Sequence, residues 1–428
     1  MKKSRILLVT DVLSFGGLET HLEELINNLP PDREFILCCR KNEYFKDENI
    51  KIYNGLVSGL SNDHKSILSD VTLLTKLIEK YKIDIVHSHA FLNLIPSVLA
   101  ANNTKIPHVL TIHGPAGILP SYGPLGNLFF YSFVIKKLNA ICVSKELIDL
   151  TNKHLQIPLE RLALLNNPIK KEENAPHTSF KWKAAAFISR LDDFKVKGLI
   201  NFLRTNKESL SFYISKLYIV GDGPAKTTLE GFSKEWNDDK IEMRFLGYIP
   251  QPAHLFPYVD FILGMGRVAL EGISHNKPVL LVGYDGFKGL VGAENFQNLL
   301  YANFSGRNMK NILLHKGNSI EPCPLEYLDD LFSESSIKKY CDILDALNFT
   351  NNPELDGLHN FLVEFEGEKF NSENLEALIK MSNAGFYKEF DFVTTQTEIA
   401  KRNIEIDYLH FYIGKCNAMI ADLSKAKR

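Results

Sequence analysis

The chain has 428 residues, which at roughly 100 to 200 residues per domain predicts two or three domains and excludes a single small module. Apolar residues make up 45% and charged residues 23%, enough for packed cores and too apolar for general disorder. Lys and Arg number 49 against 51 Asp and Glu, so the net charge of −2 gives no general attraction for nucleic acid.

Short β-rich runs alternate with amphipathic helical segments from residue 5 onward, the pattern of a mostly parallel sheet. The predicted strands are residues 5–10, 34–39, 83–88, 107–113, 139–143 and 162–165. The predicted helices, with apolar side chains at three- and four-residue spacing, are residues 19–29, 67–81 and 145–154. Together they form one complete open α/β unit.

A polar stretch at residues 170–183 then interrupts the pattern, as a linker between two cores would. The alternation resumes with predicted strands at residues 184–189, 216–220, 241–246, 260–263 and 278–282. We therefore expect one unit at residues 1–172, a second at 173–325 and a helical C-terminal region at 326–428. Two such sheets in tandem leave a cleft between the carboxyl ends of their strands, where open α/β sheets bind ligands.

The end of the chain predicts a long helix over residues 399–423. Its apolar side chains follow a heptad pattern: Ile399, Ile406, Ile413 and Ile420, with Leu409, Cys416 and Leu423. The helix is either the seam of a homo-oligomer or an apolar stripe packed on its own chain. Arg402 at the first d position and the shortness of the repeat favour the second interpretation.

Cysteine usage and the N-terminus indicate a cytoplasmic protein. The six cysteines lack a Cys-x-x-Cys pair, which indicates free thiols in a reducing compartment and no structural zinc: Cys38, Cys39, Cys142, Cys323, Cys341 and Cys416. Too few apolar residues precede Asp11 for a secretion signal. The apolar stretch at residues 125–135 is shorter than the ~20 residues that cross a bilayer. It could lie on the inner face of the cytoplasmic membrane, but its composition better suits a helix packed on the first sheet.

Candidate chemistry in the first unit lies at predicted strand ends. Gly16 and Gly17 open a helix where backbone N–H groups can face a phosphate, although such a pair is more often only a turn. His113 can hydrogen-bond a sugar hydroxyl or a diphosphate oxygen. A structural role is the ordinary interpretation of His87 and His89. Zinc binding by these three histidines is disfavoured, because no acidic or thiol partner accompanies them.

The second unit carries cations and glycine turns at its predicted strand ends. Arg190 directly follows a strand, and Lys195 and Lys197 lie where a helix begins. These cations are either a solvated basic face or groups that neutralise a departing diphosphate. Gly223 belongs to a glycine-rich turn that permits close approach of a ligand.

Two later strand ends complete the candidate site. Tyr248 and Ile249 follow one strand, and Gly266 and Arg267 follow the next. Glu271 lies in the first turns of the helix after that, and a carboxylate there can accept hydrogen bonds from both hydroxyls of a ribose.

In order and spacing, these segments resemble the retaining glycosyltransferases of family 4, which have the GT-B fold. The resemblance covers about residues 5 to 310 and rests on GGLE, HSH, TIHG, NNPI, SRL with KG, VGDGP, FLGYI, and LEG with KPV. It implies an α/β protein of two Rossmann-like domains facing a central cleft. The second domain would bind a UDP- or GDP-sugar donor, and the first a saccharide or lipid-linked saccharide acceptor. No metal or other cofactor is implied, and the anomeric configuration would be retained.

The resemblance also implies roles for individual residues. The diphosphate would contact Arg190 and either Lys195 or Lys197, with Gly16 and Gly17 near the phosphates and Arg267 as an added cation. The ribose would contact Glu271, the base Tyr248 and Ile249, and the transferred sugar His113, while Gly223 and Gly266 would line the donor site.

One departure from the family pattern raises an alternative. The family usually has two glutamates eight positions apart, and Leu263 stands where the first is expected. The donor sugar would then be recognised in another way, for instance by the backbone of Gly264 and Gly266. The alternative is a non-catalytic GT-B protein that binds a nucleotide sugar or serves as a partner subunit. We expect instead an enzyme of cell-surface polysaccharide or lipopolysaccharide synthesis; a nicotinamide oxidoreductase is excluded by the absent GxGxxG.

Overall fold

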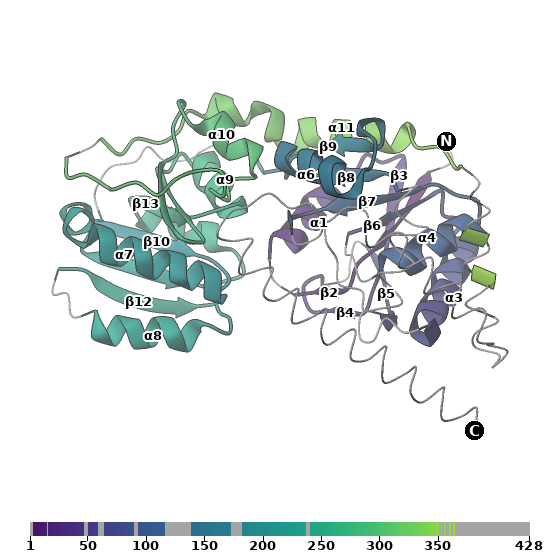
Figure 1. The fold of residues 1–428 in the computed structure, drawn as a ribbon, viewed down its shortest axis with the longest axis horizontal. Coiled ribbons are helices and arrows are strands. Elements are labelled where there is room, and N and C mark those ends of the chain that lie inside the picture. The colour runs from purple at the N-terminus through teal and green to yellow at the C-terminus, as the bar shows by residue number, and fades with distance from the viewer. Residues whose placement is uncertain are drawn as a thin grey trace, which may run out of the picture.

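The computed structural model describes residues 3–14, 16–46, 50–58, 64–89, 93–115, 138–172, 182–236, 240–317, 319–350, 352, 355–356, 359–360 and 363. Two separate sheets, each flanked by helices, form two lobes that lie side by side (Figure 1). The predicted α/β class is confirmed. The heptad helix at residues 399–423, the apolar stretch at 125–135 and most of the predicted linker lie outside the described residues.

The first lobe is built on a seven-stranded sheet in the order β5-β3-β1-β6-β7-β8-β9, in which neighbouring strands run parallel among the described residues. The strands are β1 (Ser4–Val9), β3 (Arg33–Cys39), β5 (Lys51–Asn54), β6 (Ile85–Ser88), β7 (His108–Ile112), β8 (Ala140–Cys142) and β9 (Leu162–Leu164). The helices are α1 (Gly17–Asn27), α3 (His64–Tyr81), α4 (Leu94–Asn103) and α6 (Lys145–Leu155). A short parallel pair, β2 (Val12–Leu13) and β4 (Lys41–Asn42), lies beside the sheet's carboxyl edge.

The second lobe is built on a six-stranded sheet in the order β12-β11-β10-β13-β14-β15. Its strands are β10 (Ala184–Ile188), β11 (Lys216–Val220), β12 (Glu242–Gly247), β13 (Phe261–Gly264), β14 (Val279–Gly283) and the antiparallel β15 (Gly286–Leu290). The helices are α7 (Asp193–Tyr213), α8 (Lys226–Glu235), α9 (Arg267–Ser274) and α10 (Phe296–Tyr301), with 3-10 turns η5 (Pro252–Tyr258) and η6 (Leu325–Leu331); η4 (Leu159–Arg161) belongs to the first lobe. Buried apolar side chains pack on both faces of the sheet, as expected of a mostly parallel sheet.

The chain returns to the first lobe after η6. Residues 331–333 lead into α11 (Ser333–Asp345), which lies over the first lobe in Figure 1. Ile337, Tyr340 and Leu344 of this helix are buried in the core that also contains strands β1 and β3. The described start of the predicted C-terminal region is therefore helical, and α11 completes the core of the first lobe.

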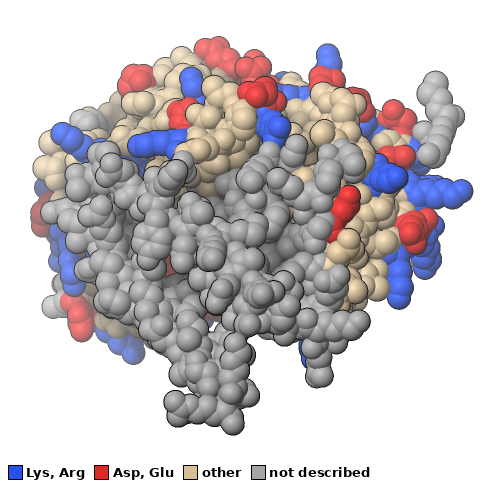
Figure 2. Space-filling view, turned by 45° about the vertical axis from the view of Figure 1, so that its right-hand side comes forward, with Lys and Arg blue, Asp and Glu red and all other residues tan. Residues whose placement is uncertain are grey.

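The surface and the cysteines add two observations. On the face in Figure 2, Lys and Arg side chains are interspersed with Asp and Glu around the described surface. The cysteines within the described ranges are free thiols, and all of them are buried. A free thiol is small and weakly polar, so it packs well among apolar side chains. None of the helices among the described residues is long and apolar enough to cross a membrane.

Candidate active site

The two lobes meet where strands of both sheets end. Tyr301 of α10 donates a hydrogen bond to Asp149 of α6 at 2.8 Å, and Arg307 forms an ion pair with Glu146 at the start of the same helix. Nearer the crossover, the Asn167 side chain donates to Asn303 at 3.1 Å. The carboxyl ends of β7 and β8 therefore face the second lobe, as the tandem pattern predicts.

The glycines after β1 form the start of α1. Gly17 is the first helical residue, and a Cβ added there would meet nothing within 4 Å. Glu19, which the sequence analysis did not single out, closes the preceding loop by accepting a hydrogen bond from the backbone N–H of Ser14 at 2.9 Å. The open space beside Gly17 leaves room for a ligand at the positive end of the helix, where we expected phosphates.

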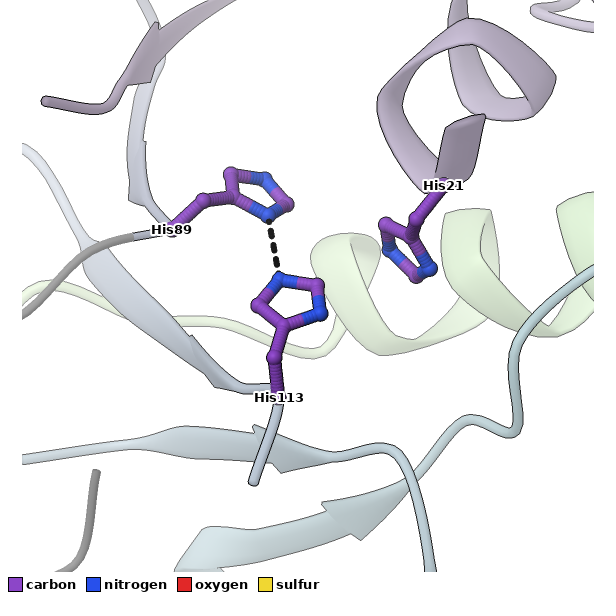
Figure 3. Close-up of side chains that lie close together, drawn as sticks. All are labelled: His21, His89 and His113. Atoms are coloured by element: carbon purple, nitrogen blue, oxygen red, sulfur yellow. Dashed lines mark hydrogen bonds between the residues drawn. The ribbon is translucent and has the colours of Figure 1, made fainter. Parts of the chain in front are cut away.

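Three histidines from three elements converge beside this turn: His21 of α1, His89 after β6 and His113 after β7 (Figure 3). His89 Nδ1 and His113 Nε2 lie 3.2 Å apart in a hydrogen bond, and the His21 and His113 ring centres are 4.9 Å apart. Asn167 Oδ1 accepts from His21 Nδ1 at 3.1 Å, which turns His21 Nε2 toward the cluster. That nitrogen is buried and has no partner among the described residues.

His87 has a structural role, as the ordinary interpretation held. Both of its ring nitrogens are hydrogen-bonded, to Tyr340 Oη at 2.8 Å and to Thr111 Oγ1 at 2.7 Å. Its ring packs against that of His89, with 3.9 Å between ring centres and an angle of 40° between the ring planes, so His87 supports the cluster by packing. His21 was not predicted from the sequence. It lies on the buried face of α1 together with Glu19, Leu22 and Leu25, and this position on an amphipathic helix is the one feature of the sequence that points to it.

The histidines are held neutral. Burial lowers the pKa of His113 to about 4 and that of His108, at the other end of β7, to about 3. Burial, together with neighbouring histidines, also lowers the pKa of His21, His87 and His89 well below the usual value. Neutral imidazoles can donate or accept hydrogen bonds to an uncharged sugar without adding a charge to the site.

The cluster could also hold a metal, since one ligand atom from each of the three histidines lies within 4.8 Å of the others. Its surroundings suit a dication poorly. No carboxylate belongs to the group, the Arg267 charge acts on His21, and the His89–His113 hydrogen bond would have to break. The geometry of the cluster is that of hydrogen-bonded neutral imidazoles.

Acid should destabilise the protein through these buried histidines. A histidine that is neutral when folded and has its ordinary pKa of 6.5 when unfolded takes up protons only on unfolding as the pH falls. Above pH 6.5 such a histidine does not lower the free energy of unfolding. Below pH 6.5 the free energy of unfolding falls by about 1.4 kcal/mol per pH unit for each such histidine, until the pH reaches the pKa of the folded state. We expect the urea midpoint to drop steeply from pH 6.5 to 4.5. His108→Gln should reduce that slope, and an unchanged slope would contradict the assignment.

In the second lobe, Arg190 is exposed after β10, and none of the described residues pairs with its guanidinium. Asp192 caps α7 by accepting from the Lys195 backbone N–H at 3.1 Å, and its carboxylate lies 3.3 Å from Lys195 Nζ. Lys197 is exposed on the opposite side of the helix. Arg190 thus precedes the start of α7 by three residues and Lys195 lies in its first turn, while Lys197 is exposed on another face of the helix.

The glycines after β11 are required by packing. A Cβ on Gly221 would lie 1.9 Å from the Ser189 carbonyl oxygen, and one on Gly223 would lie 2.5 Å from that of Leu191. Both residues have positive φ, of 134° and 156°. The turn predicted to approach a ligand therefore presses on the β10–α7 loop and fixes the backbone that carries Arg190.

Tyr248, after β12, is 39% exposed and faces the first lobe. Its pKa is raised by burial and then by the carboxylates of Glu19 and Glu23 on α1. Ile249 packs against the core of the second lobe. Of this predicted base-binding pair, the tyrosine is the one directed at the boundary between the lobes.

Comparison with known proteins finds similarity to glycosyltransferases. Residues 15–173 match the sequence profile of Glycosyltransferase Family 4. An uncharacterised glycosyltransferase of Methanocaldococcus jannaschii is 25% identical over 300 residues, 66% of this chain and 82% of its own. The first lobe is thus similar to the family 4 glycosyltransferases, and both matches support a glycosyltransferase.

Further similarities agree with this assignment. The putative teichuronic acid biosynthesis glycosyltransferase TuaC of Bacillus subtilis is 26% identical over 240 residues, 54% of this chain and 60% of its own. Among solved structures, the lipopolysaccharide outer core galactosyltransferase WaaB has a TM-score of 0.53 at 15% identity, covering 80% of this chain and 99% of its own. A glycosyltransferase of Rickettsia africae has a TM-score of 0.51 at 16% identity, covering 89% and 99%. The fold of this enzyme is thus GT-B, as predicted.

Leu263, which stands where the resemblance predicts a glutamate, lies in β13. Leu263 pairs with Phe187 of β10 and Leu280 of β14, and its side chain is fully buried in the core under α7. Gly266, at φ 62°, donates its N–H to the Phe304 carbonyl at 2.8 Å, so that N–H is not free for a sugar. Arg267 and Glu271 of α9 hydrogen-bond to one another at 3.0 Å.

Proposed function

We propose that this glycosyltransferase moves a sugar from a UDP- or GDP-sugar to a saccharide or lipid-linked saccharide, with retention of configuration. The observation that carries the proposal is the unpaired, exposed Arg190 beside Lys195 at the amino end of α7. There a positive helix end and two cations can bind a diphosphate. The similarity to WaaB, a lipopolysaccharide outer core galactosyltransferase, and to TuaC, a putative teichuronic acid biosynthesis glycosyltransferase, supports a role in cell-surface polysaccharide or lipopolysaccharide synthesis.

The amino end of α7 and the first lobe share a neighbour, Tyr284. Asp192 acts electrostatically on Tyr284, and so does Glu146 of the first lobe. As the bond from the sugar to the diphosphate lengthens, negative charge develops on the leaving oxygen. Arg190 and Lys195 would stabilise that charge without reorganisation, because Asp192 and the Gly221–Gly223 turn already hold their backbone in place.

The histidine cluster supplies the opposite wall of the proposed site. His113 would hydrogen-bond the transferred sugar, while His21 and His89 hold its ring in place. The chemistry needs no metal, since cations of the chain itself neutralise the diphosphate. The proposed donor-binding set is Gly16, Gly17, Arg190, Lys195, Gly223, Tyr248, Ile249 and Glu271; Gly266 would only line the site, because its N–H is already bonded to Phe304.

A panel of nucleoside diphosphates tests the donor class. UDP or GDP should raise the melting temperature, because a ligand at about 100 times its Kd adds about 2.7 kcal/mol of stability; ADP, CMP and dTDP should not. The shift should persist in EDTA. Incubation with the nucleotide-sugar donor and an acceptor should then release the nucleoside diphosphate. The NMR signal of the anomeric proton of the product reports whether the configuration is retained. A panel without any stabilising nucleotide would overturn the proposal.

Lys195, rather than Lys197, should bind the diphosphate. The side chain of Lys195 is next to Asp192 at the start of α7, whereas Lys197 is exposed on the opposite face. Gly198, the glycine of the Lys-Gly pair, is needed for packing, because a Cβ there would lie 2.0 Å from the Gly283 carbonyl oxygen. We expect Lys195→Ala to weaken nucleoside diphosphate binding about tenfold by calorimetry. Lys197→Ala is its matched control; the reverse order would refute the assignment.

A further inference from the structure

Arg267 is in contact with three separate parts of the molecule. Its Nε donates to Glu271 Oε1 of the same helix at 3.0 Å, and its Nη1 donates to the Pro168 carbonyl at 2.9 Å. Its Nη2 lies 3.9 Å from Glu24 Oε1 of α1. The side chain is only 10% exposed, so the guanidinium is enclosed by these partners.

The partners of Arg267 lie where the chain passes between the lobes. Pro168 precedes Ile169, which pairs with Phe332 in an isolated parallel bridge. The Ser333 hydroxyl, at the start of α11, lies 2.5 Å from Glu24 Oε2 and 2.9 Å from the Ile169 carbonyl oxygen, and its single proton is shared between these two acceptors. Glu24 therefore joins α1 to the returning chain with one oxygen and faces Arg267 with the other. Arg267 connects α9 to both crossings.

We infer that Arg267 is a positioning residue, which holds the Glu271 carboxylate for the donor ribose and links its placement to the arrangement of the two lobes. The inference rests on the proposed function, because it requires a nucleotide donor. It replaces the expectation that Arg267 binds the diphosphate: each of its terminal groups already faces a partner in the chain. At the family's first glutamate position, Leu263 supplies no carboxylate, so Glu271 is the carboxylate of this motif that remains for the donor.

The charges around Glu271 give the inference a pH signature. Burial raises the pKa of Glu271, whereas Arg267 and then His275 lower it, and Glu24 raises it. Without Arg267 the carboxylate would protonate at higher pH. The ionised carboxylate offers one acceptor oxygen to each ribose hydroxyl, whereas protonation turns one of these oxygens into a donor and weakens that arrangement. Loss of Arg267 should therefore weaken nucleotide binding more at pH 6 than at pH 8.

The test compares Arg267→Leu and Arg267→Lys with wild type and with Arg244→Leu, a control whose exposed arginine pairs only with Glu242 of its own strand among the described residues. Binding is measured by calorimetry at pH 6 and 8, with the nucleoside diphosphate that stabilises wild type and with the corresponding nucleoside. We expect Arg267→Leu to weaken both ligands about tenfold at pH 8 and further at pH 6. Arg267→Lys, which keeps the charge, should restore the wild-type pH dependence.

Three results would overturn the inference. The first is wild-type affinity of Arg267→Leu at both pH values. The second is a loss confined to the diphosphate, which would mean direct phosphate contact. The third is an equal loss at both pH values in both variants, which would mean a purely structural role. If Arg267→Leu does not fold, Arg267→Lys decides the question alone. The inference then requires that Arg267→Lys binds the nucleoside diphosphate more weakly than wild type, with the same pH dependence as wild type. Failure of wild type to bind any nucleotide would instead overturn the proposed function.

Discussion

Replacing Arg190 with alanine should lower kcat about 100- to 1,000-fold, the usual cost of removing one group that stabilises charge in a transition state. Arg190 is exposed and unpaired among the described residues, so its loss leaves no buried partner without a hydrogen bond. The melting temperature should stay close to that of wild type. Release of nucleoside diphosphate under saturating donor measures kcat directly.

The form of the kinetic defect decides what Arg190 does. A fall in kcat with little change in KM means that the guanidinium acts mainly on the leaving diphosphate. A rise in KM alone would mean that it only binds the donor, contrary to the proposed role. Arg244→Ala provides the control, because Arg244 is exposed on β12 and pairs with Glu242 two residues away. That variant should be indistinguishable from wild type.

Gly221→Ala should destabilise the protein by about 3 kcal/mol or more, the largest stability change that we expect. Its φ of 134° disfavours any side chain, and the added Cβ would lie 1.9 Å from a backbone oxygen that cannot rotate away. If the protein folds, the β10–α7 loop must shift, and Arg190 with it. Donor turnover should therefore fall together with the urea midpoint.

Gly231→Ala is the matched control for this substitution. Gly231 lies within α8, is exposed, and has nothing within 4 Å of the position that a Cβ would occupy. Alanine favours the helix by about 0.5–1 kcal/mol relative to glycine, so this variant should be slightly more stable than wild type. Equal urea midpoints for the two variants would show that the contact at Gly221 is not what the structure indicates.

The sequence predicted most strands because their information is local. The strand at residues 216–220 matches β11 in both bounds, and the other predicted strands match to within two residues. The missed elements lack the expected pattern. β5 is a short edge strand without a fully buried residue, and β15 contains Gly286, Gly289 and a buried lysine, Lys288. α4 has no polar face, since nine consecutive residues from Leu94 are buried, so it lacks an amphipathic period.

The candidate site was only partly predictable, because its contacts join distant parts of the chain. His113 could be proposed from a strand end, but the role of His21 depends on Asn167, 146 residues away. Arg267 looked like a phosphate ligand because charge next to a glycine turn suggests one. Its partners Pro168 and Glu24 are set by the crossing of the chain between the lobes, which no local pattern reveals.

The return of the chain to the first lobe has a consequence for synthesis on the ribosome. Tyr340 of α11 is fully buried, stacks on His87 and lies beside Phe35 of β3. The strands of the first lobe are made first, yet their core lacks this helix until residue 345 has left the exit tunnel. In the second lobe, made later, the last strand among the described residues ends at residue 290. The half of the enzyme that is translated first is therefore the half whose packing is completed last.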